Sequence, residues 1–246
     1  NWYEPVDTLL VQMDRCGVER AVLIQMLGRY ENGYQQDCFA KSPDRFMSVV
    51  GIDPADAGGP DALRRLAGEG ATGVRLRPDA PAALWSAAGS LGLAVSCVGT
   101  AAAVAAPAFA EVLAGASGPV VLEHLAGLAR PDVGDLAALL GPVLALARFP
   151  NVYVKIPGLG QLAARGPRLP AEGPPFATDD AVGLLNDVVT AFGADRLMWG
   201  SDHPVVSSRE GYANALAWTQ TALGHLPEGD RVNIFGGVAQ RVFGRR

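Results

Sequence analysis

The stretch Leu197-Met198-Trp199-Gly200-Ser201-Asp202-His203-Pro204 decides the fold of this chain. An apolar run ends in a small, tight turn that delivers one carboxylate, Asp202, and Pro204 follows where a strand is expected to end. A carboxylate at the end of a buried strand is costly unless it binds a metal, a proton or a substrate. In a parallel α/β barrel, the C-terminal ends of the strands form the active site. The stretch therefore predicts a functional aspartate at the mouth of a barrel. The alternative is an aspartate that caps the next helix or braces a turn.

A short apolar strand, a turn and an amphipathic helix recur along the whole chain, as in successive βα units. The predicted strands are Ala21–Gln25, Phe46–Ile52, Thr72–Arg77, Ala94–Val98, Val120–His124, Val152–Ile156 and Leu197–Ser201. The predicted helices are Val6–Cys16, Pro60–Glu69, Pro81–Leu91, Phe109–Ala116, Asp132–Ala147 and Asp179–Phe192.

These strands predict a (β/α)8 TIM barrel, formed by residues 1–246 as a single domain, because one further strand would close the sheet. The chain opens on a helix, so the missing first strand is expected before residue 1. An open doubly wound sheet ranks second, because no glycine-rich turn of the form GxGxxG follows the first strand.

The composition argues against several classes of protein. Hydrophobic residues make up 49% of the chain and charged residues 18%, which suits one large core and excludes a disordered chain. The net charge is -5 without any basic cluster, which argues against nucleic acid or an anionic membrane as a partner. Cys16, Cys38 and Cys97 are far apart and lack metal spacing, so we expect reduced thiols in a cytoplasmic protein.

Large polar side chains interrupt two of the predicted strands at alternate positions: Arg75 and Arg77, Tyr153 and Lys155. Residues two apart share one face of a strand, so these four side chains are expected to point into the barrel near its mouth. Arg77 and Lys155, at the strand ends, suit an anionic group such as a carboxylate. The alternative is a buried ion-pair network with Asp202 or Glu123 that only fills the barrel.

Of the three histidines, His124 is the best candidate for proton transfer. It ends a predicted strand, and the near-neutral pKa of an imidazole suits an acid or a base. A buried structural histidine is the alternative. His203 adjoins Asp202 and is a candidate for contact with a substrate, whereas His225 lies in a polar segment and is expected at the surface.

Five segments resemble the amidohydrolase-2 family and occur in the order seen in that family, so that the resemblance covers essentially the whole chain. They are Gly17–Gln25, Gly73–Leu76, Leu122–Gly127, Asn151–Ile156 and Met198–Pro204. The ending Ile234–Phe243 also resembles the last helix of the family, and Gly200–Val205 is most similar to the branch that hydrolyses sugar lactones and pyrone lactones. The resemblance implies a TIM-barrel enzyme that hydrolyses C–O or C–N bonds or decarboxylates aromatic or enoic acids. It further implies that Asp202 is a metal ligand or a general base and that His124 polarises the substrate or assists proton transfer.

The resemblance implies a zinc site as well, and here the sequence departs from the family. The family's first-strand His-x-His has no counterpart in this chain, and Val98 stands near the place of another family histidine. A catalytic zinc needs about three protein ligands. Asp202 would be a metal ligand only with an upstream His-x-His, and Cys97 would point to the other strand face. The sequence therefore predicts an incomplete zinc site, and otherwise no cofactor.

The predicted function is hydrolysis of a lactone, ester or amide bond in a small, carboxylate-bearing substrate. Asp202 would take a proton from water or hold a metal-bound hydroxide, with His124 assisting. The residues predicted to bind the substrate or its oxyanion are Arg75, Arg77, Tyr153, Lys155 and His203. The alternatives are a non-oxidative decarboxylase of the same family and a non-catalytic barrel that has lost its metal site. A homodimer is one possible assembly. The segment Pro157–Thr178, rich in proline and glycine, is predicted to be a mobile loop over the pocket.

Overall fold

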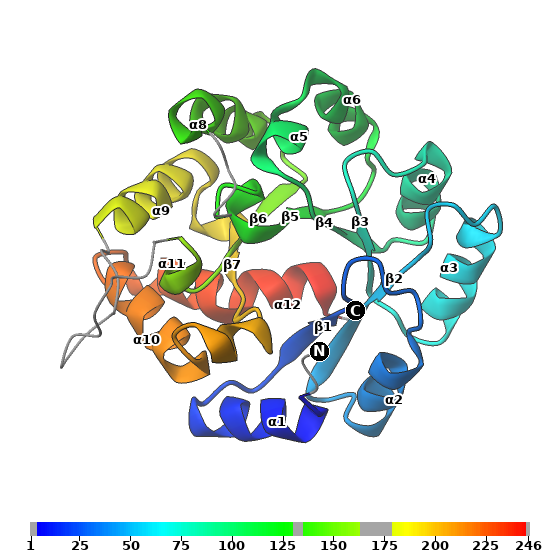
Figure 1. Ribbon diagram of the computed structural model, residues 1–246, viewed down its shortest axis with the longest axis horizontal. Coiled ribbons are helices and arrows are strands. Elements are labelled where there is room, and N and C mark those ends of the chain that lie inside the picture. Colours follow the sequence, from blue (N-terminus) through cyan, green and yellow to red (C-terminus); the bar gives the residue numbers. More distant parts are fainter. Residues whose placement is uncertain (1–3, 130–134, 163–178, 245–246) are drawn as a thin grey trace.

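The structure, a computed structural model, describes residues 4–129, 135–162 and 179–244 of the chain. Seven parallel strands form one curled sheet, and their order in the sheet is their order in the chain (Figure 1). The strands are β1 (Ala21–Ile24), β2 (Phe46–Gly51), β3 (Gly73–Leu76), β4 (Ala94–Cys97), β5 (Val120–Leu122), β6 (Val152–Ile156) and β7 (Leu197–Trp199). All seven predicted strands are confirmed, although most of them end one or two residues earlier than predicted.

Most helices surround this sheet in a ring, as in a TIM barrel, rather than covering both faces of an open sheet, whereas α12 lies inside the ring in this view (Figure 1). The helices of the described residues are α1 (Val6–Arg15), α2 (Gly33–Lys41), α3 (Gly59–Gly68), α4 (Ala82–Ser90), α5 (Ala101–Ala105), α6 (Pro107–Gly115), α7 (Glu123–Ala126), α8 (Leu136–Leu144), α9 (Asp179–Phe192), α10 (Tyr212–Ala222), α11 (Glu228–Val232) and α12 (Val238–Phe243). The start of the predicted helix Asp132–Ala147 and most of the predicted loop Pro157–Thr178 lie outside the described residues. None of the helices in the described ranges is long and apolar enough to cross a membrane.

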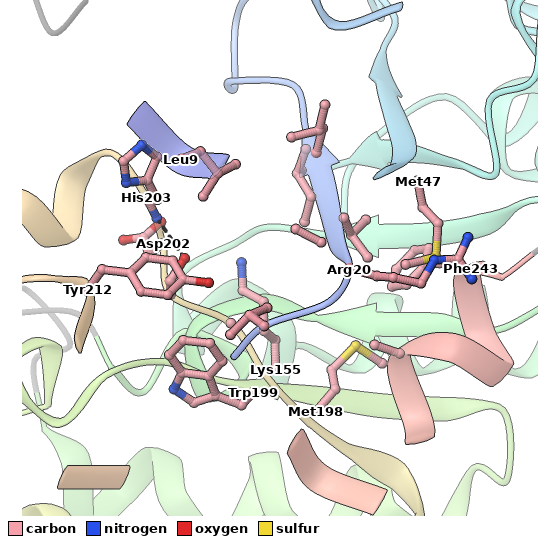
Figure 2. Close-up of a pocket in the computed structure, with 18 of the residues that line it drawn as sticks. Leu9, Arg20, Met47, Lys155, Met198, Trp199, Asp202, His203, Tyr212 and Phe243 are labelled. Atoms are coloured by element: carbon pink, nitrogen blue, oxygen red, sulfur yellow. Dashed lines mark hydrogen bonds between the residues drawn. The ribbon is translucent and has the colours of Figure 1, made fainter. Parts of the chain in front are cut away.

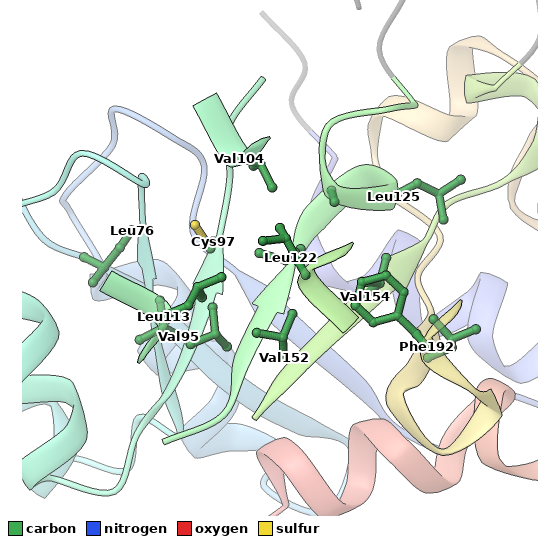
Figure 3. Close-up of a cluster of buried hydrophobic side chains, with 14 of the residues drawn as sticks. Leu76, Val95, Cys97, Val104, Leu113, Leu122, Leu125, Val152, Val154 and Phe192 are labelled. Atoms are coloured by element: carbon green, nitrogen blue, oxygen red, sulfur yellow. The ribbon is translucent and has the colours of Figure 1, made fainter. Parts of the chain in front are cut away.

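Alternate residues of the strands face opposite sides of the sheet, and the buried apolar residues of the described ranges form three clusters. Outward-facing residues such as Val95, Leu122 and Val154 pack under the ring of helices (Figure 3). The inner core is smaller and consists of Met47, Val49, Ala94, Val121, Met198, Val238 and Phe243. Phe243 of α12 packs close to Gly73, the first residue of β3, so α12 closes the N-terminal end of the barrel. Arg75, Ser96 and Lys155, which also face inward, are thereby left towards the C-terminal end, where they line a cavity.

The sheet is open between β1 and β7, which are its two edges. Among the described residues β1 pairs only with β2, and β7 only with β6. Alternate residues of a parallel strand bond to opposite neighbours, and the N–H of Gln25 donates to Val49 of β2. Val22 and Ile24 therefore present their backbone groups to the open side. The strand predicted to close the barrel is not among the described residues.

Candidate active site

A cavity of about 870 Å³ opens at the C-terminal ends of β6 and β7 and runs down between the edge strands. Figure 2 shows its two ends, with Lys155, Asp202, His203 and Tyr212 at one and Met47, Met198 and Phe243 at the other. Consecutive residues of β1 line the cavity, since the backbone edge of this strand, rather than one face, is exposed to it. The cavity thus joins the predicted polar site to the open side of the barrel.

Asp202 and His124 face each other beyond the ends of β7 and β5. Nε2 of His124 lies 3.7 Å from Oδ1 of Asp202, which is longer than a hydrogen bond and would be an ion-pair distance when the imidazole is protonated. Burial opposes ionisation of Asp202, but His124 and Lys155 outweigh it, so the pKa of Asp202 lies below its usual value. The structure therefore brings the two predicted catalytic side chains together, with Asp202 as an anion on the cavity wall.

A left-handed backbone turn places His124. The predicted strand Val120–His124 is too long, because the chain leaves the sheet after Leu122 and enters α7. The φ angles of His124, Leu125 and Ala126 are 53°, 50° and 57°. Left-handed backbone costs about 1–2 kcal/mol for each residue with a Cβ, so the surroundings must hold this turn. Leu125 and Ala126 are fully buried in the outer core, which provides that support.

Glu123 is the buried centre of a network of charges beside the cavity. Its Oε1 accepts a hydrogen bond of 2.6 Å from Ser96, and its Oε2 accepts one of 2.5 Å from Arg75. Nζ of Lys155 and Nδ1 of His124 each lie 3.8 Å from Oε2. Burial alone would raise the pKa of Glu123, but Lys155, Arg75 and His124 lower it to about 2. Glu123 is thus an anion that holds two cations and the imidazole in place.

Lys155 extends from the inner face of β6 into the polar end of the cavity (Figure 2). Its side chain passes over Gly200, where a Cβ would lie only 2.9 Å from Cδ of Lys155. Glycine at this position therefore leaves the room that the lysine needs. Because the contact with Glu123 is 3.8 Å long, the ammonium retains hydrogen-bond donors for an anionic ligand.

The structure separates the two predicted arginines. Arg75 points into the barrel as predicted, but its guanidinium bonds to Glu123 and, at 2.9 Å, to the carbonyl of Gln25. This is the ion-pair network that the sequence left open as an alternative. Arg77 is not brought to the cavity, because β3 ends one residue before it. Its side chain is 54% exposed and pairs with Asp79.

Tyr153 and His203 are the other predicted substrate-binding residues, and they lie at different depths in the barrel. Tyr153 faces inward but packs against the inner core, away from the polar end of the cavity. His203 lines the cavity, with Nε2 at 3.2 Å from a carboxylate oxygen of Glu4. Burial lowers the pKa of His203, and Glu4 opposes this. Of these two residues, only His203 belongs to the lining of the cavity, next to Asp202.

Sequence patterns do not mark Arg209 and Glu210, which lie behind Asp202. Nη1 of Arg209 donates a hydrogen bond of 3.5 Å to Oδ2 of Asp202, and its Nε lies 3.5 Å from Oε2 of Glu210. Burial raises the pKa of Glu210, which Arg209 opposes. A charged pair in a polar segment looks like surface in the sequence, so no local signal identifies it.

The described residues do not form a zinc site by themselves. His124 and Asp202 offer two donors, and within the described ranges no three acidic, histidine or cysteine side chains gather around a point. Val98 is a buried apolar residue. Cys97 faces the outer core, where burial raises the pKa of its thiol well above the usual value.

A family model and several solved structures are similar to this chain. A family model described as Amidohydrolase matches residues 4–245. An amidohydrolase of Burkholderia multivorans with bound HEPES has a TM-score of 0.82, with 21% identity over 99% of this chain and 89% of that one. The same Burkholderia protein has also been solved with bound zinc. The sequence matches no curated protein.

Two further solved structures are similar to this chain. A probable 2-pyrone-4,6-dicarboxylic acid hydrolase of Acinetobacter baumannii with bound citric acid has a TM-score of 0.77, with 18% identity over 100% of this chain and 91% of that one. A 5-carboxyvanillate decarboxylase of Sphingomonas paucimobilis has a TM-score of 0.68, with 17% identity over 98% and 83%. At these identities the likeness establishes the fold alone.

Proposed function

Since the chain belongs to the amidohydrolase family, we propose that it hydrolyses the ester bond of a small lactone that carries a carboxylate. One observation supports this most: a carboxylate anion and an ammonium group line the polar end of one cavity, and an imidazole lies 3.7 Å from that carboxylate. These groups belong to Asp202, Lys155 and His124. Together they offer a base, a proton carrier and an anion-binding group, which are the elements that ester hydrolysis needs.

In the proposed reaction, water attacks the lactone carbonyl carbon and gives a proton to Asp202. The carbonyl oxygen becomes an oxyanion, which the ammonium of Lys155 stabilises in a partly buried site. When the intermediate collapses, the ring C–O bond breaks. The leaving oxygen takes the proton back through the Asp202–His124 pair, so that the product is an open-chain acid with a free hydroxyl group.

The charges around the cavity favour an anionic substrate. Arg75 is neutralised by Glu123, whereas Lys155 reaches the cavity without a close hydrogen-bonding partner among the described residues. The ammonium has three N–H donors, so it can bind a substrate carboxylate as well as the oxyanion. Two of the similar structures, with citric acid and with HEPES, hold anionic small molecules.

Incubation with 2-pyrone-4,6-dicarboxylate tests this function. We expect the ultraviolet absorbance of the pyrone to disappear as the ring opens, and a neutral pyrone to react more slowly. The matched control is Asp202→Asn, which keeps the shape of the side chain and removes its charge. Failure of the wild-type protein to open any lactone in a panel of carboxylate-bearing lactones would contradict the proposal.

Non-oxidative decarboxylation is the second candidate, because the same pair can protonate carbon. His124, held between Glu123 and Asp202, would donate the proton, and Lys155 would bind the carboxylate that leaves as CO2. Release of CO2 from 5-carboxyvanillate or 2,6-dihydroxybenzoate, without activity on lactones, would favour it.

A further inference from the structure

The carboxylate of Glu210 is enclosed by two glycines of the loop that follows β6. A Cβ at Gly158 or at Gly160 would collide with this carboxylate. The N–H of Gly160 donates a hydrogen bond of 3.2 Å to Oε1 of Glu210. The described start of this loop, residues 157–162, therefore passes around the Glu210 side chain, which is fully buried.

The same side chain reaches Asp202 through its neighbour. Nε of Arg209 lies 3.5 Å from Oε2 of Glu210, and Nη1 of Arg209 lies 3.5 Å from Oδ2 of Asp202. The N–H of Val206 donates to the carbonyl of Asp202 at 3.0 Å, and the N–H of Gly211 donates to the carbonyl of Val206 at 2.9 Å. Asp202 and Glu210 thus begin and end one compact loop.

Burying the charges of Arg209 and Glu210 costs free energy. Oε2 of Glu210 and both Nε and Nη2 of Arg209 are inaccessible to solvent and make no hydrogen bond within the described ranges. Buried charges without full hydrogen bonding add little to stability, so they call for another explanation. Neither residue is among those that line the cavity, whereas Asp202 is, so the pair adjoins the cavity through Asp202.

We propose that Glu210 is a positioning residue: it holds Arg209 against Asp202, so that Asp202 faces His124, and fixes the loop after β6 to the same point. That loop follows β6, the strand that carries Lys155. The carboxylate of Glu210 therefore contacts both the support of Asp202 and the segment next to Lys155. The inference rests on the proposed hydrolysis, and it concerns the geometry of Asp202 rather than the identity of the substrate.

Glu210→Gln tests the charge alone, because glutamine keeps the size of the side chain and an oxygen for the N–H of Gly160. With 2-pyrone-4,6-dicarboxylate we expect kcat to fall about 10- to 100-fold with KM nearly unchanged, since a misplaced base slows the chemical step. The melting temperature should fall only slightly, because Arg209 keeps the carboxylate of Asp202 as a partner. Glu228→Gln, at an exposed acid of α11, is the matched control. Wild-type kcat in Glu210→Gln would overturn the proposal.

A paired variant separates positioning from packing. Gly160→Ala alone should lower both the melting temperature and kcat, because its methyl group collides with Glu210. In Gly160→Ala/Glu210→Ala the collision is gone, so we expect the melting temperature to recover while kcat stays low. Recovery of both would mean that Glu210 only fills space.

An NMR measurement keeps the test independent of turnover. The chain has only three histidines, so the imidazole resonances of His124 can be assigned with a His124→Gln variant. We expect them to shift in Glu210→Gln and to stay in place in Glu228→Gln. If the wild-type protein opens no lactone, the proposed function fails, and the His124 resonances alone decide whether Glu210 positions the pair. Unchanged resonances would then refute the inference.

Discussion

Nε2 of His124 and Oδ1 of Asp202 lie 3.7 Å apart, and both residues have left-handed backbone, with φ of 53° and 57°. Such backbone persists in residues with a Cβ only where the surrounding structure holds it, and it is concentrated at functional sites. Here Leu125 is buried on one side, and Arg209 contacts Asp202 on the other. The surrounding structure therefore holds the two side chains next to each other, although the left-handed backbone of both residues is locally unfavourable in energy.

Removing the charge of Asp202 should abolish most of the activity. Asp202→Asn preserves the shape of the side chain but cannot take a proton from water, so we expect kcat to fall by about 10²–10⁴-fold. Steady-state kinetics with 2-pyrone-4,6-dicarboxylate measure this. Asp187→Asn, at an exposed position of α9, is the control and should behave as the wild type. Turnover close to that of the wild type in Asp202→Asn would rule out a base at this position.

Removing the charge of Lys155 should lower the activity, whereas removing the charge of Arg77 should not. Lys155→Met removes the ammonium group in the cavity, so we expect kcat/KM for a carboxylate-bearing lactone to fall about 100-fold, and less for a neutral lactone. Arg77→Met should leave both values unchanged, because Arg77 is exposed and pairs with Asp79. Equal losses for both substrates in Lys155→Met would mean that the lysine does not recognise the substrate anion.

Gly127 should be essential to the turn that carries His124. It has a φ of 82°, and a Cβ there would lie 2.5 Å from the backbone nitrogen of Ala101. We expect Gly127→Ala to lower the free energy of unfolding by about 2–4 kcal/mol, measured by urea denaturation. In Gly183→Ala, within α9, the methyl group meets no other atom, so this control should be neutral or stabilising by up to about 1 kcal/mol. Similar stabilities of the two variants would contradict this account of the turn.

Glu123 should make the stability of the protein depend on acid pH. Its pKa is lowered from the usual 4.5 to about 2, so its charge stabilises the folded state above pH 4.5. This contribution is lost as the pH falls from about 4.5 towards 2, because the unfolded chain binds the proton first. Urea denaturation across this range should show a shallower dependence on pH in Glu123→Gln than in the wild type.

The same variant has a second expected effect at neutral pH. Glu123→Gln leaves the buried guanidinium of Arg75 without its ion pair, which costs about 3–5 kcal/mol. Arg75→Met/Glu123→Gln removes both charges and should lose less stability than Glu123→Gln alone. An equal pH dependence in all three proteins would show that Glu123 titrates normally in the folded state.

Hydrogen exchange should identify the open edge of the sheet. Val22 and Ile24 direct their N–H groups away from β2, and all four residues of β1 are partly exposed, whereas β2 is buried throughout. We therefore expect these two amides to exchange much faster than Gln25, whose N–H donates to Val49. Equal protection of Val22 and Gln25 would indicate that another strand pairs with β1.

The sequence determined the features that depend on local periodicity. Alternation along β3 and β6 correctly assigned Arg75, Tyr153 and Lys155 to the inner face, because successive side chains of a strand must point to opposite sides. The apolar run before Asp202 correctly placed that carboxylate just beyond the end of a strand. These are properties of neighbouring residues, so a single sequence contains them.

Only the tertiary structure decided where each strand ends and which charges meet. β3 ends before Arg77, and the side chain of Arg77 is exposed to solvent. β5 ends before Glu123, and the side chain of Glu123 is buried between Arg75 and Lys155. Glu210 meets Gly160, fifty positions earlier in the chain, and Arg209 meets Asp202. Coulomb and packing energies depend on distances in space rather than on separation along the chain, so no local pattern could reveal these contacts.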